Sequence, residues 1–286
     1  MKARKISICL DIKLSSIRNC YIGVSKSFYI ALKDKYNVDI IDLAKNASDI
    51  LLFHNSIDNN NTMSNALHKF MFCHNTMQLG IRADCYYGHY KCIANSEIMR
   101  DTFHKKHGHP FEVGIVHNFP NWELRDLYQS RKGIVWLTRL YPHTLSVFRE
   151  FVDFCKWRGV IPSVVSSIAP PKDTMPFINL IPRVEYCDLE DFLNTFEFGV
   201  GIGRSALDMS LCGVKTTVAG IYIPEPIGED TVENHIKSNF NSILNRSEFS
   251  FEEVFCQSKK TRELIMETMS PNRMLCEIEK ILEGVI

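Results

Sequence analysis

The sequence has no surplus of charge of either sign. Its 33 lysine and arginine residues are balanced by 33 aspartate and glutamate residues, so the formal net charge is zero. A protein that coats nucleic acid needs a strong positive field, and this composition provides at most a local basic patch. The balance therefore excludes a strongly basic protein of the kind that coats nucleic acid.

Long apolar runs are also missing. The run from Ile6 to Leu10 is too short for the core of a signal peptide, and no window approaches the roughly eighteen apolar residues of a membrane span. We therefore expect a cytoplasmic protein without a transmembrane segment. With 286 residues, 45% of them hydrophobic, the chain is long enough for one large or two ordinary domains, and disorder is excluded as its main state.

Closely spaced cysteine pairs are absent. The ten cysteines include no C-x-x-C pair and lie mostly in apolar stretches, which indicates reduced core cysteines and not disulfides or zinc ligands. His104, His107 and His109 lie at the end of a predicted helix beside lysines, without an acid or a cysteine nearby, so we predict no metal site. No Ser-His-Asp or Cys-His arrangement for a nucleophile follows from the spacing either.

Strand and helix patterns alternate along the whole chain, which predicts parallel sheets covered by helices. Two such halves, with a ligand at the carboxyl ends of strands that face a cleft, fit this pattern. The polar stretch 118–129 has no strong period, and we place the domain boundary there. The expected strands are 5–10, 38–42, 50–54, 92–94, 111–116, 134–140, 160–168, 177–181, 198–202, 215–219 and 221–223, and the expected helices begin near Ser25, Ser96, Leu145, Asp188, Ser205 and Ser270.

Three local signals mark helix ends. Ser96 can cap one helix, and Gly159 should stop the helix that begins near Leu145. Ser270, with Pro271 at the first helical position, should open an amphipathic helix at the end of the chain.

A glycine-containing turn at residues 200–213, VGIGRSALDMSLCG, is the most informative segment. Glycines let an anion approach the backbone, and a helix N-terminus adds N–H groups and a positive dipole end. Arg204 could grip a diphosphate, and Asp208 could accept hydrogen bonds from ribose hydroxyls. Alternatively, Ser205 and Asp208 have the spacing of a capping box, in which case Asp208 only stabilises the start of the helix. Both interpretations remain open.

Two segments of the second half are distinctive, 200–218, VGIGRSALDMSLCGVKTTV, and 134–142, IVWLTRLYP. They resemble the nucleotide-sugar-binding turn, helix and strand, and the arginine-delivering strand, of GT-B glycosyltransferases, in particular the large retaining family. Residues 93–121, IANSEIMRDTFHKKHGHPFEVGIVHNFPN, and 72–75, FCHN, are similar to segments of its acceptor domain. The four segments occur in the order of the family.

The resemblance implies an α/β GT-B fold, in which two Rossmann-like parallel-sheet domains face a cleft. Residues 1–130 would form the acceptor-binding domain, 131–268 the donor-binding domain, and 269–286 a helix that can cross back to the first domain. The implied activity is retaining, metal-independent transfer of a hexose to an acceptor. The co-substrate would be a nucleotide-diphosphate sugar, a UDP-sugar being favoured, and no cofactor is expected.

The resemblance also assigns roles to individual residues. It implies that His74 approaches the transferred sugar, Arg139 contacts the donor diphosphate and Arg204 lies beside the phosphates, so these three form the expected catalytic set. The expected donor-binding set is Arg139, Thr144, Gly201, Gly203, Arg204, Ser205 and Asp208, and His117 and Asn118 are expected on the acceptor side.

Two positions depart from the family pattern. Thr144 replaces the lysine that often follows the arginine by five positions, and Val200 replaces the first acid of a paired-glutamate pattern. The sequence also contains no D-x-D motif, which the other main glycosyltransferase architecture uses to chelate a metal. The charge of a departing nucleotide diphosphate would therefore be met by Arg139, Arg204 and helix N–H groups.

The sequence leaves alternatives open for both the acceptor and the activity. We favour a glycan acceptor because the net charge is zero, whereas modified phage DNA containing hydroxymethylcytosine or glucosyl-hydroxymethylcytosine is the alternative. A non-catalytic nucleotide-sugar-binding protein, or a relative that performs epimerisation or phosphorolysis, would also explain the motifs. Two basic clusters keep the DNA acceptor open, Arg100 with Lys105 and Lys106, and Lys259 with Lys260 and Arg262.

Overall fold

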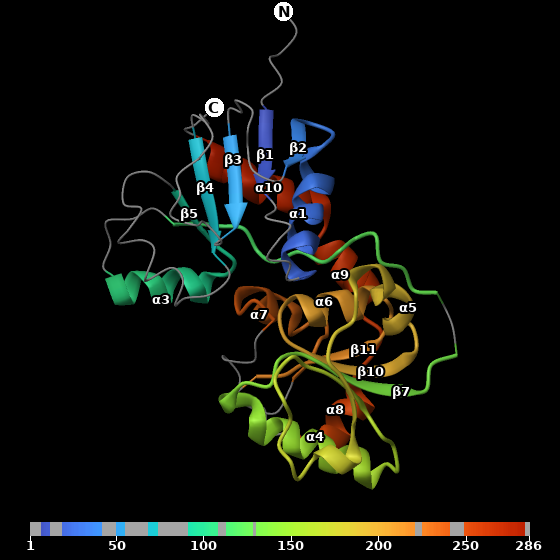
Figure 1. Cartoon of the computed structure of the whole chain (residues 1–286). Coiled ribbons are helices and arrows are strands. Elements are labelled where there is room, and N and C mark those ends of the chain that lie inside the picture. Colours follow the sequence, from blue (N-terminus) through green and yellow to red (C-terminus); the bar gives the residue numbers. More distant parts are fainter. Residues whose placement is uncertain are drawn as a thin grey trace, which may run out of the picture. The chain divides into compact units, whose positions relative to one another are not determined.

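The computed structural model of the chain describes residues 7–11, 19–41, 50–54, 68–73, 91–107, 113–127, 130–220, 225–240 and 249–283. The chain divides into two compact units, one made of Met1–Phe119 with Ser270–Ile286 and the other of Pro120–Met269. Both units combine helices with a parallel sheet, which confirms the predicted α/β class (Figure 1). The expected functions of the two halves, acceptor binding and donor binding, stay predictions.

The first unit contains a six-stranded sheet in the order β2-β1-β3-β4-β5-β6, and every neighbouring pair is parallel. Phe28 on a helix packs edge-on against Phe72 on a strand, with ring centroids 5.5 Å apart, and both side chains are buried. The elements are β1 (Ser7–Asp11), α1 (Asn19–Leu32), β2 (Asn37–Ile41), β3 (Ile50–His54), β4 (His68–Cys73), β5 (Lys91–Ala94), α3 (Glu97–His107), β6 (Val113–Ile115) and α10 (Pro271–Leu282).

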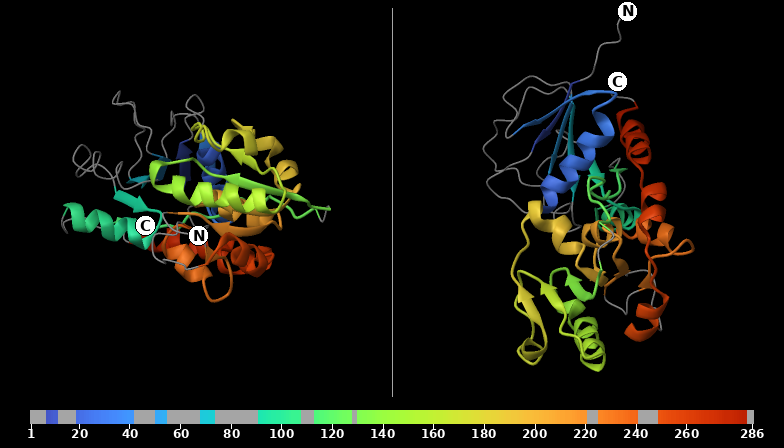
Figure 2. Two further views of the ribbon diagram at one scale, coloured as in Figure 1. Left: turned by 90° about the horizontal axis from the view of Figure 1, so that it is seen from below. Right: turned by 90° about the vertical axis from the view of Figure 1, so that its right-hand side faces the viewer.

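The last helix, α10, belongs to the first unit although it follows the second unit in sequence (Figure 2). It packs against α1, and the Tyr36 hydroxyl donates a 2.9 Å hydrogen bond to Glu279. The Ser270 hydroxyl accepts a hydrogen bond from the Arg273 N–H, and Pro271 occupies the first turn, so the predicted helix start is confirmed.

The second unit contains a sheet in the order β12-β11-β10-β7-β8-β9, in which only the short edge strand β12 is antiparallel. Trp136 on β7 lies fully buried between Phe148 and Phe151 of α4, which places the aromatic core between sheet and helix. The strands are β7 (Gly133–Leu137), β8 (Ser163–Val165), β9 (Asn179–Ile181), β10 (Phe196–Gly201), β11 (Lys215–Val218) and β12 (Glu225–Pro226). The helices are α4 (Leu145–Trp157), α5 (Leu189–Leu193), α6 (Arg204–Leu211), α7 (Val232–Lys237), α8 (Phe251–Gln257) and α9 (Arg262–Thr268).

Several sequence expectations change in detail. The strand expected over 160–168 is only Ser163–Val165, and the strand expected over 221–223 lies outside the described residues. Gly159 follows the end of α4 with φ of 66°, which confirms the predicted stop. Ser96 accepts a hydrogen bond from the Met99 N–H, which confirms the predicted cap.

The expectation of core cysteines is wrong for three residues. The six cysteines whose side chains the structure describes are all free thiols. Cys155 and Cys212 are buried, and burial raises the pKa of the Cys155 thiol to about 12. Cys187, Cys256 and Cys276 are exposed. They lie in helical segments, and the apolar residues around them in the sequence do not show that these three positions face the solvent. Among the described helices, none is long and apolar enough to cross a membrane.

A buried ionic network fixes the segment before β7 to the end of α6. The Arg131 guanidinium donates to the Asp126 carboxylate and to the carbonyls of Cys212 and Gly213, which follow the last turn of α6. It also donates a 2.7 Å hydrogen bond to the Asn194 side chain. The Arg131 and Asp126 side chains are only 6% and 5% exposed, so this pair is desolvated.

Candidate functional site

The expected donor-binding residues gather at the carboxyl ends of β7 and β10. These strands are parallel neighbours, and Leu137 at the end of β7 pairs with Gly201 at the end of β10. Arg139 and Gly203 each follow two residues later, so they leave the same edge of the sheet side by side. Ligands of open parallel sheets bind at this edge.

The two glycines are required by the local packing. A Cβ atom on Gly201 would lie 2.6 Å from the Met209 side chain and 2.9 Å from the Ala206 nitrogen, so α6 could not approach the strand end as it does. Gly203 has φ of 58° and its N–H donates a 2.7 Å hydrogen bond to the Phe240 carbonyl. The turn alone explains both glycines, and their expected role of leaving room for the donor stays a prediction.

The N–H groups at the start of α6 are largely occupied by the turn itself. Ser205 donates its N–H to the Ile202 carbonyl at 3.3 Å, and Ala206 donates to the Gly203 carbonyl at 3.1 Å. An anion at this position would therefore be attracted by the positive end of the helix and by nearby cations more than by a ring of open N–H groups. The expected donor contact of the Ser205 side chain stays a prediction.

Asp208 does not belong to a capping box. The N-cap residue of α6 is Gly203, and no side chain caps this helix. The Asp208 carboxylate instead accepts a 3.0 Å hydrogen bond from the Asn121 N–H and pairs with the Arg204 Nε at 3.3 Å. Both charged side chains are nearly buried, so Asp208 fastens α6 to the segment that begins this unit.

Replacing Asp208 with alanine should lower the free energy of unfolding by about 1–3 kcal/mol, because a buried N–H of Asn121 and the Arg204 guanidinium would lose their acceptor. Urea denaturation followed by circular dichroism measures this loss. Asp191→Ala, at an exposed position on α5, is the matched control and should change stability little. Equal stability of the two variants would contradict the structural role of Asp208, while the expected ribose contact stays a separate prediction.

Arg139 differs from Arg204, which pairs with Asp208, in its surroundings. It is half-buried in the loop after β7, and within the described part of the chain its guanidinium has neither an ion-pair nor a hydrogen-bond partner. The loop is held by the Ser166 hydroxyl, which accepts the Leu140 N–H at 3.4 Å and donates to the Ile168 carbonyl at 2.9 Å. An arginine held at a strand end in this way can meet an anionic ligand.

Thr144 is fully buried and closes the turn that follows Arg139. Its hydroxyl accepts the Tyr141 N–H at 3.1 Å and donates to the Tyr141 carbonyl at 3.0 Å. The same turn presents a feature that sequence reasoning missed, because the exposed rings of Tyr141 and His143 stack with centroids 5.4 Å apart. Two aromatic rings around Pro142 directly after a strand are the signal that could have identified it. A donor contact of Thr144 stays a prediction.

His117 lies in the first unit between two carboxylates. Its Nδ1 is 2.9 Å from Glu277 on α10, and its Nε2 is 2.8 Å from Glu97 at the start of α3. Burial alone would lower the pKa of His117, but hydrogen bonds to both carboxylates and their charges outweigh it and raise the pKa above its ordinary value. The opposite change occurs at Glu97, whose pKa is lowered by His117 despite partial burial. The acceptor-side roles of His117 and Asn118 stay predictions.

This cluster predicts a specific pH dependence of stability. The raised pKa of His117 contributes stability fully below 6.5, its ordinary value, and that contribution is lost as the pH rises through the raised pKa. The lowered pKa of Glu97 contributes stability above 4.5, and that contribution is lost as the pH falls through the lowered pKa. The difference in unfolding free energy between the wild type and His117→Gln should therefore be largest between these values.

Denaturation at several pH values measures this difference, with His143→Gln, at an exposed position in the second unit, as control. The control should not reproduce the pH profile. A wild-type advantage over His117→Gln that stays constant from pH 5 to pH 9 would contradict a charged His117.

The described residues cover two further expectations only in part, the role of His74 and the absence of a metal site. His74, the residue expected beside the transferred sugar, lies outside the described residues. Within the described ranges, no group of three or more histidine, cysteine, aspartate or glutamate side chains is arranged so that it could hold a metal ion; in the His117 cluster both ring nitrogens already face carboxylates.

Comparison with known proteins identifies the class of fold. No protein-family model matches the sequence, and no curated protein does. Among solved structures, AviGT4, a glycosyltransferase involved in avilamycin A biosynthesis, superposes with a TM-score of 0.63 over 98% of this chain and 97% of its own, at 10% sequence identity. Alr3699/HepE from Anabaena, solved in complex with UDP and glucose, gives a TM-score of 0.57 over 98% of this chain and 100% of its own, at 10% identity.

A glycosyltransferase from Rickettsia africae gives a TM-score of 0.53 over 99% of each chain, at 14% identity. These likenesses extend over both units, each of which contains a largely parallel sheet. The chain therefore has the GT-B glycosyltransferase fold.

Proposed function

We propose that this protein is a retaining glycosyltransferase that moves a hexose from a nucleotide-diphosphate sugar to a glycan. The GT-B fold and the order of the four motif segments support this proposal. The UDP and glucose bound to the Anabaena protein favour a UDP-sugar as the donor. The zero net charge favours a glycan over a polyanionic acceptor such as DNA.

One observation carries the proposal. Arg139 and the start of α6 leave neighbouring parallel strands at the same sheet edge, since Leu137 pairs with Gly201. A half-buried cation without a described partner thus lies next to the positive end of a helix. This combination suits a diphosphate whose negative charge grows when the bond to the sugar breaks.

In the proposed reaction, the bond between the anomeric carbon and the β-phosphate oxygen breaks, and the acceptor oxygen bonds to that carbon on the same face. The proton of the acceptor hydroxyl passes to the departing phosphate oxygen. Arg139 and the α6 dipole stabilise the diphosphate charge, with Arg204 close by. His74 is proposed to contact the transferred sugar, and Asp208 the ribose.

A non-catalytic nucleotide-sugar-binding protein is the second candidate. Val200, at the position of a family acid, is a fully buried β10 residue, and the Thr144 hydroxyl is engaged in its own turn. Incubation with UDP-sugars, with and without a mixture of oligosaccharides, separates the two candidates. A transferase should release UDP at a rate that rises with acceptor, whereas a binding protein should bind UDP and release none from the sugar.

Transfer should be independent of divalent metal. We expect the same initial rate with EDTA as with added magnesium, because the proposed site meets the diphosphate charge with Arg139 and a helix end. The measurement is UDP release at saturating donor after exhaustive dialysis against EDTA. Complete loss of activity that magnesium restores would contradict this part of the proposal.

A further inference from the structure

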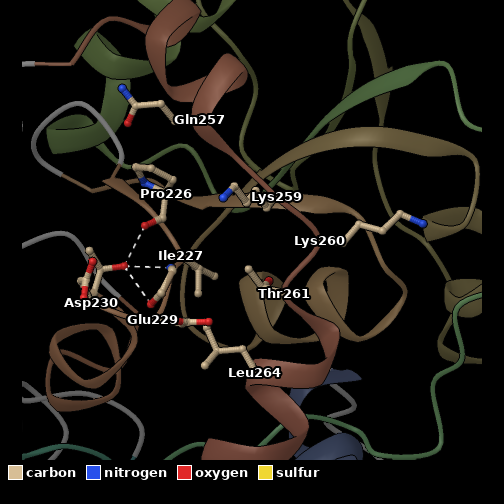
Figure 3. Close-up of a pocket in the computed structure, with 11 residues that line it drawn as sticks. Pro226, Ile227, Glu229, Asp230, Gln257, Lys259, Lys260, Thr261 and Leu264 are labelled. Carbon is tan, nitrogen blue, oxygen red and sulfur yellow. Dashed lines mark hydrogen bonds between the residues drawn. The ribbon is translucent and has the colours of Figure 1, made fainter.

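A pocket lies in the Pro120–Met269 unit, and none of its lining residues belongs to the expected donor-binding set. It has a volume of about 390 Å³ and is lined by the turn that leads from β12 into α7 and by the segment that joins α8 to α9 (Figure 3). Because β12 is antiparallel to β11, the chain beyond Pro226 runs toward the edge where the parallel strands begin. The expected donor-binding turn at Gly203 lies where they end.

One wall of this pocket is a turn held by a single hydroxyl. The Thr231 Oγ1 accepts the Gly228 N–H at 2.9 Å and donates to the Pro226 carbonyl at 2.9 Å. The Gly228 carbonyl accepts the Val232 N–H at 2.8 Å, which continues the turn into α7. The wall is therefore formed before any ligand binds, which lowers the entropic cost of binding.

The segment that joins α8 to α9, which forms the opposite wall through Thr261 and its neighbours, contains two buried hydroxyl groups, and only Thr261 of the two lines the pocket. Ser258 and Thr261 are each only 4% exposed, and the Ser258 Oγ and Thr261 Oγ1 have no hydrogen-bond partner among the described residues. Thr261 lines the pocket directly and occupies the N-cap position of α9, yet it makes no capping hydrogen bond. Buried hydroxyls are almost always hydrogen-bonded, so an unpartnered hydroxyl in a pocket wall points to a ligand that supplies the partner.

The remaining lining indicates which ligand chemistry fits. Glu229 and Asp230 offer carboxylate acceptors on one side, and Lys259 offers a donor on the other, so the pocket favours neither a simple anion nor a simple cation. Ile227 and Leu264 add apolar surface between the polar groups (Figure 3).

Lys260, by contrast, extends away from these residues in Figure 3 and pairs with Asp126 at 3.4 Å. Both lysines line the pocket, but Lys260 pairs with an acid outside it, so Lys259 is the donor opposite the two carboxylates. Acceptors on one side, a donor on the other and an apolar patch between them match the hydroxyl groups and C–H faces of a sugar.

We propose that this pocket is a saccharide-binding site, distinct from the expected donor-binding edge and sized for one or two neutral sugar units. Its volume lies at the lower end of the range of about 300–1,000 Å³ for small-molecule sites. Glu229 and Asp230 accept hydrogen bonds from sugar hydroxyls, Thr261 exchanges one with the most deeply bound hydroxyl, and Ile227 contacts a C–H face. The proposal extends beyond sugar transfer and does not depend on it.

Saturation-transfer NMR and calorimetry of the full chain test the proposal. The probes are glucose, galactose, N-acetylglucosamine and their β-linked disaccharides, with inorganic phosphate as a charged comparison. We expect at least one saccharide to bind saturably, with equal affinity when UDP is also present. Thr261→Val and Glu229→Gln should each weaken that binding about fivefold or more, since each removes one hydrogen-bonding group.

Glu267→Gln, at an exposed position on α9, is the control and should bind the saccharide as the wild type does. Glu229 is exposed, so Glu229→Gln keeps the test valid if Thr261→Val fails to fold. The proposal would be overturned if no saccharide bound, if neither variant weakened binding, or if UDP displaced the sugar. Phosphate binding that Lys259→Ala abolishes, without saccharide binding, would replace it with an anion site. A failure to bind UDP would contradict the transferase proposal alone.

Discussion

Arg139→Ala is expected to lower the rate of sugar transfer from a UDP-sugar about tenfold or more, and to weaken UDP binding by a similar factor. Arg139 is half-buried at the carboxyl end of β7, and no described residue neutralises its guanidinium. In the proposed site, Arg204 pairs with Asp208 and the α6 dipole is a partial charge, so neither would fully replace the charge of Arg139. The rate of UDP release and calorimetric titration with UDP measure the two effects.

Arg149→Ala is the matched control for this prediction. Arg149 lies on α4 in the same unit, is exposed and pairs with Asp173 at 3.2 Å, so its loss should change neither turnover nor UDP affinity. Arg139→Lys should recover part of the activity, because it keeps the charge but loses the two-pronged geometry of the guanidinium. Normal turnover and UDP affinity in Arg139→Ala would show that the diphosphate binds elsewhere.

Arg131→Ala is expected to cause the largest loss of stability, about 3–5 kcal/mol. The substitution would leave the Asp126 carboxylate, which is only 5% exposed, without its buried partner. It would also remove the donors that satisfy the carbonyls of Cys212 and Gly213 after α6, and one hydrogen bond to Asn194. Denaturant titration, followed by tryptophan fluorescence, measures the loss.

Arg125→Ala provides the comparison, because Arg125 also pairs with an acid, Glu190, but its side chain is 71% exposed. An exposed pair contributes little to stability, so this variant should unfold close to the wild-type midpoint. If Arg131→Ala unfolded at the same denaturant concentration as Arg125→Ala, the buried network would not contribute as the geometry indicates.

The parts of the fold that sequence could predict depend on local signals. Alternating apolar patterns predict both parallel sheets, and Ser270 with Pro271 predicts the start of α10, because a cap and a first-turn proline act within a few residues. Gly159 likewise predicts the end of α4. Glycine adopts a positive φ without steric cost, and this depends only on the residue type at that position. These features need no knowledge of distant contacts.

The candidate site was less predictable, because its partners are distant in sequence. Asp208 has capping-box spacing with Ser205, yet it bonds to Asn121, 87 residues earlier, and a spacing rule cannot anticipate that contact. His117 similarly meets Glu277, 160 residues later, on a helix that returns to the first unit.

Motif resemblance selected residues that follow β7 and β10, and the fold makes these two strands neighbours, while their donor-binding role stays a prediction. It did not reveal the buried Arg131 network or the stacked rings of Tyr141 and His143. Those depend on side-chain packing that is particular to this chain.

The central claim is that the edge formed by β7, β10 and α6 binds a nucleotide diphosphate without metal. Calorimetric titration of the wild-type chain with UDP in the presence of EDTA tests it most directly. We predict saturable binding at one site. At a UDP concentration of 100 times the dissociation constant, the free energy of unfolding should rise by about 2.7 kcal/mol. Absence of binding at millimolar UDP, or binding that appears only when magnesium is added, would contradict the claim.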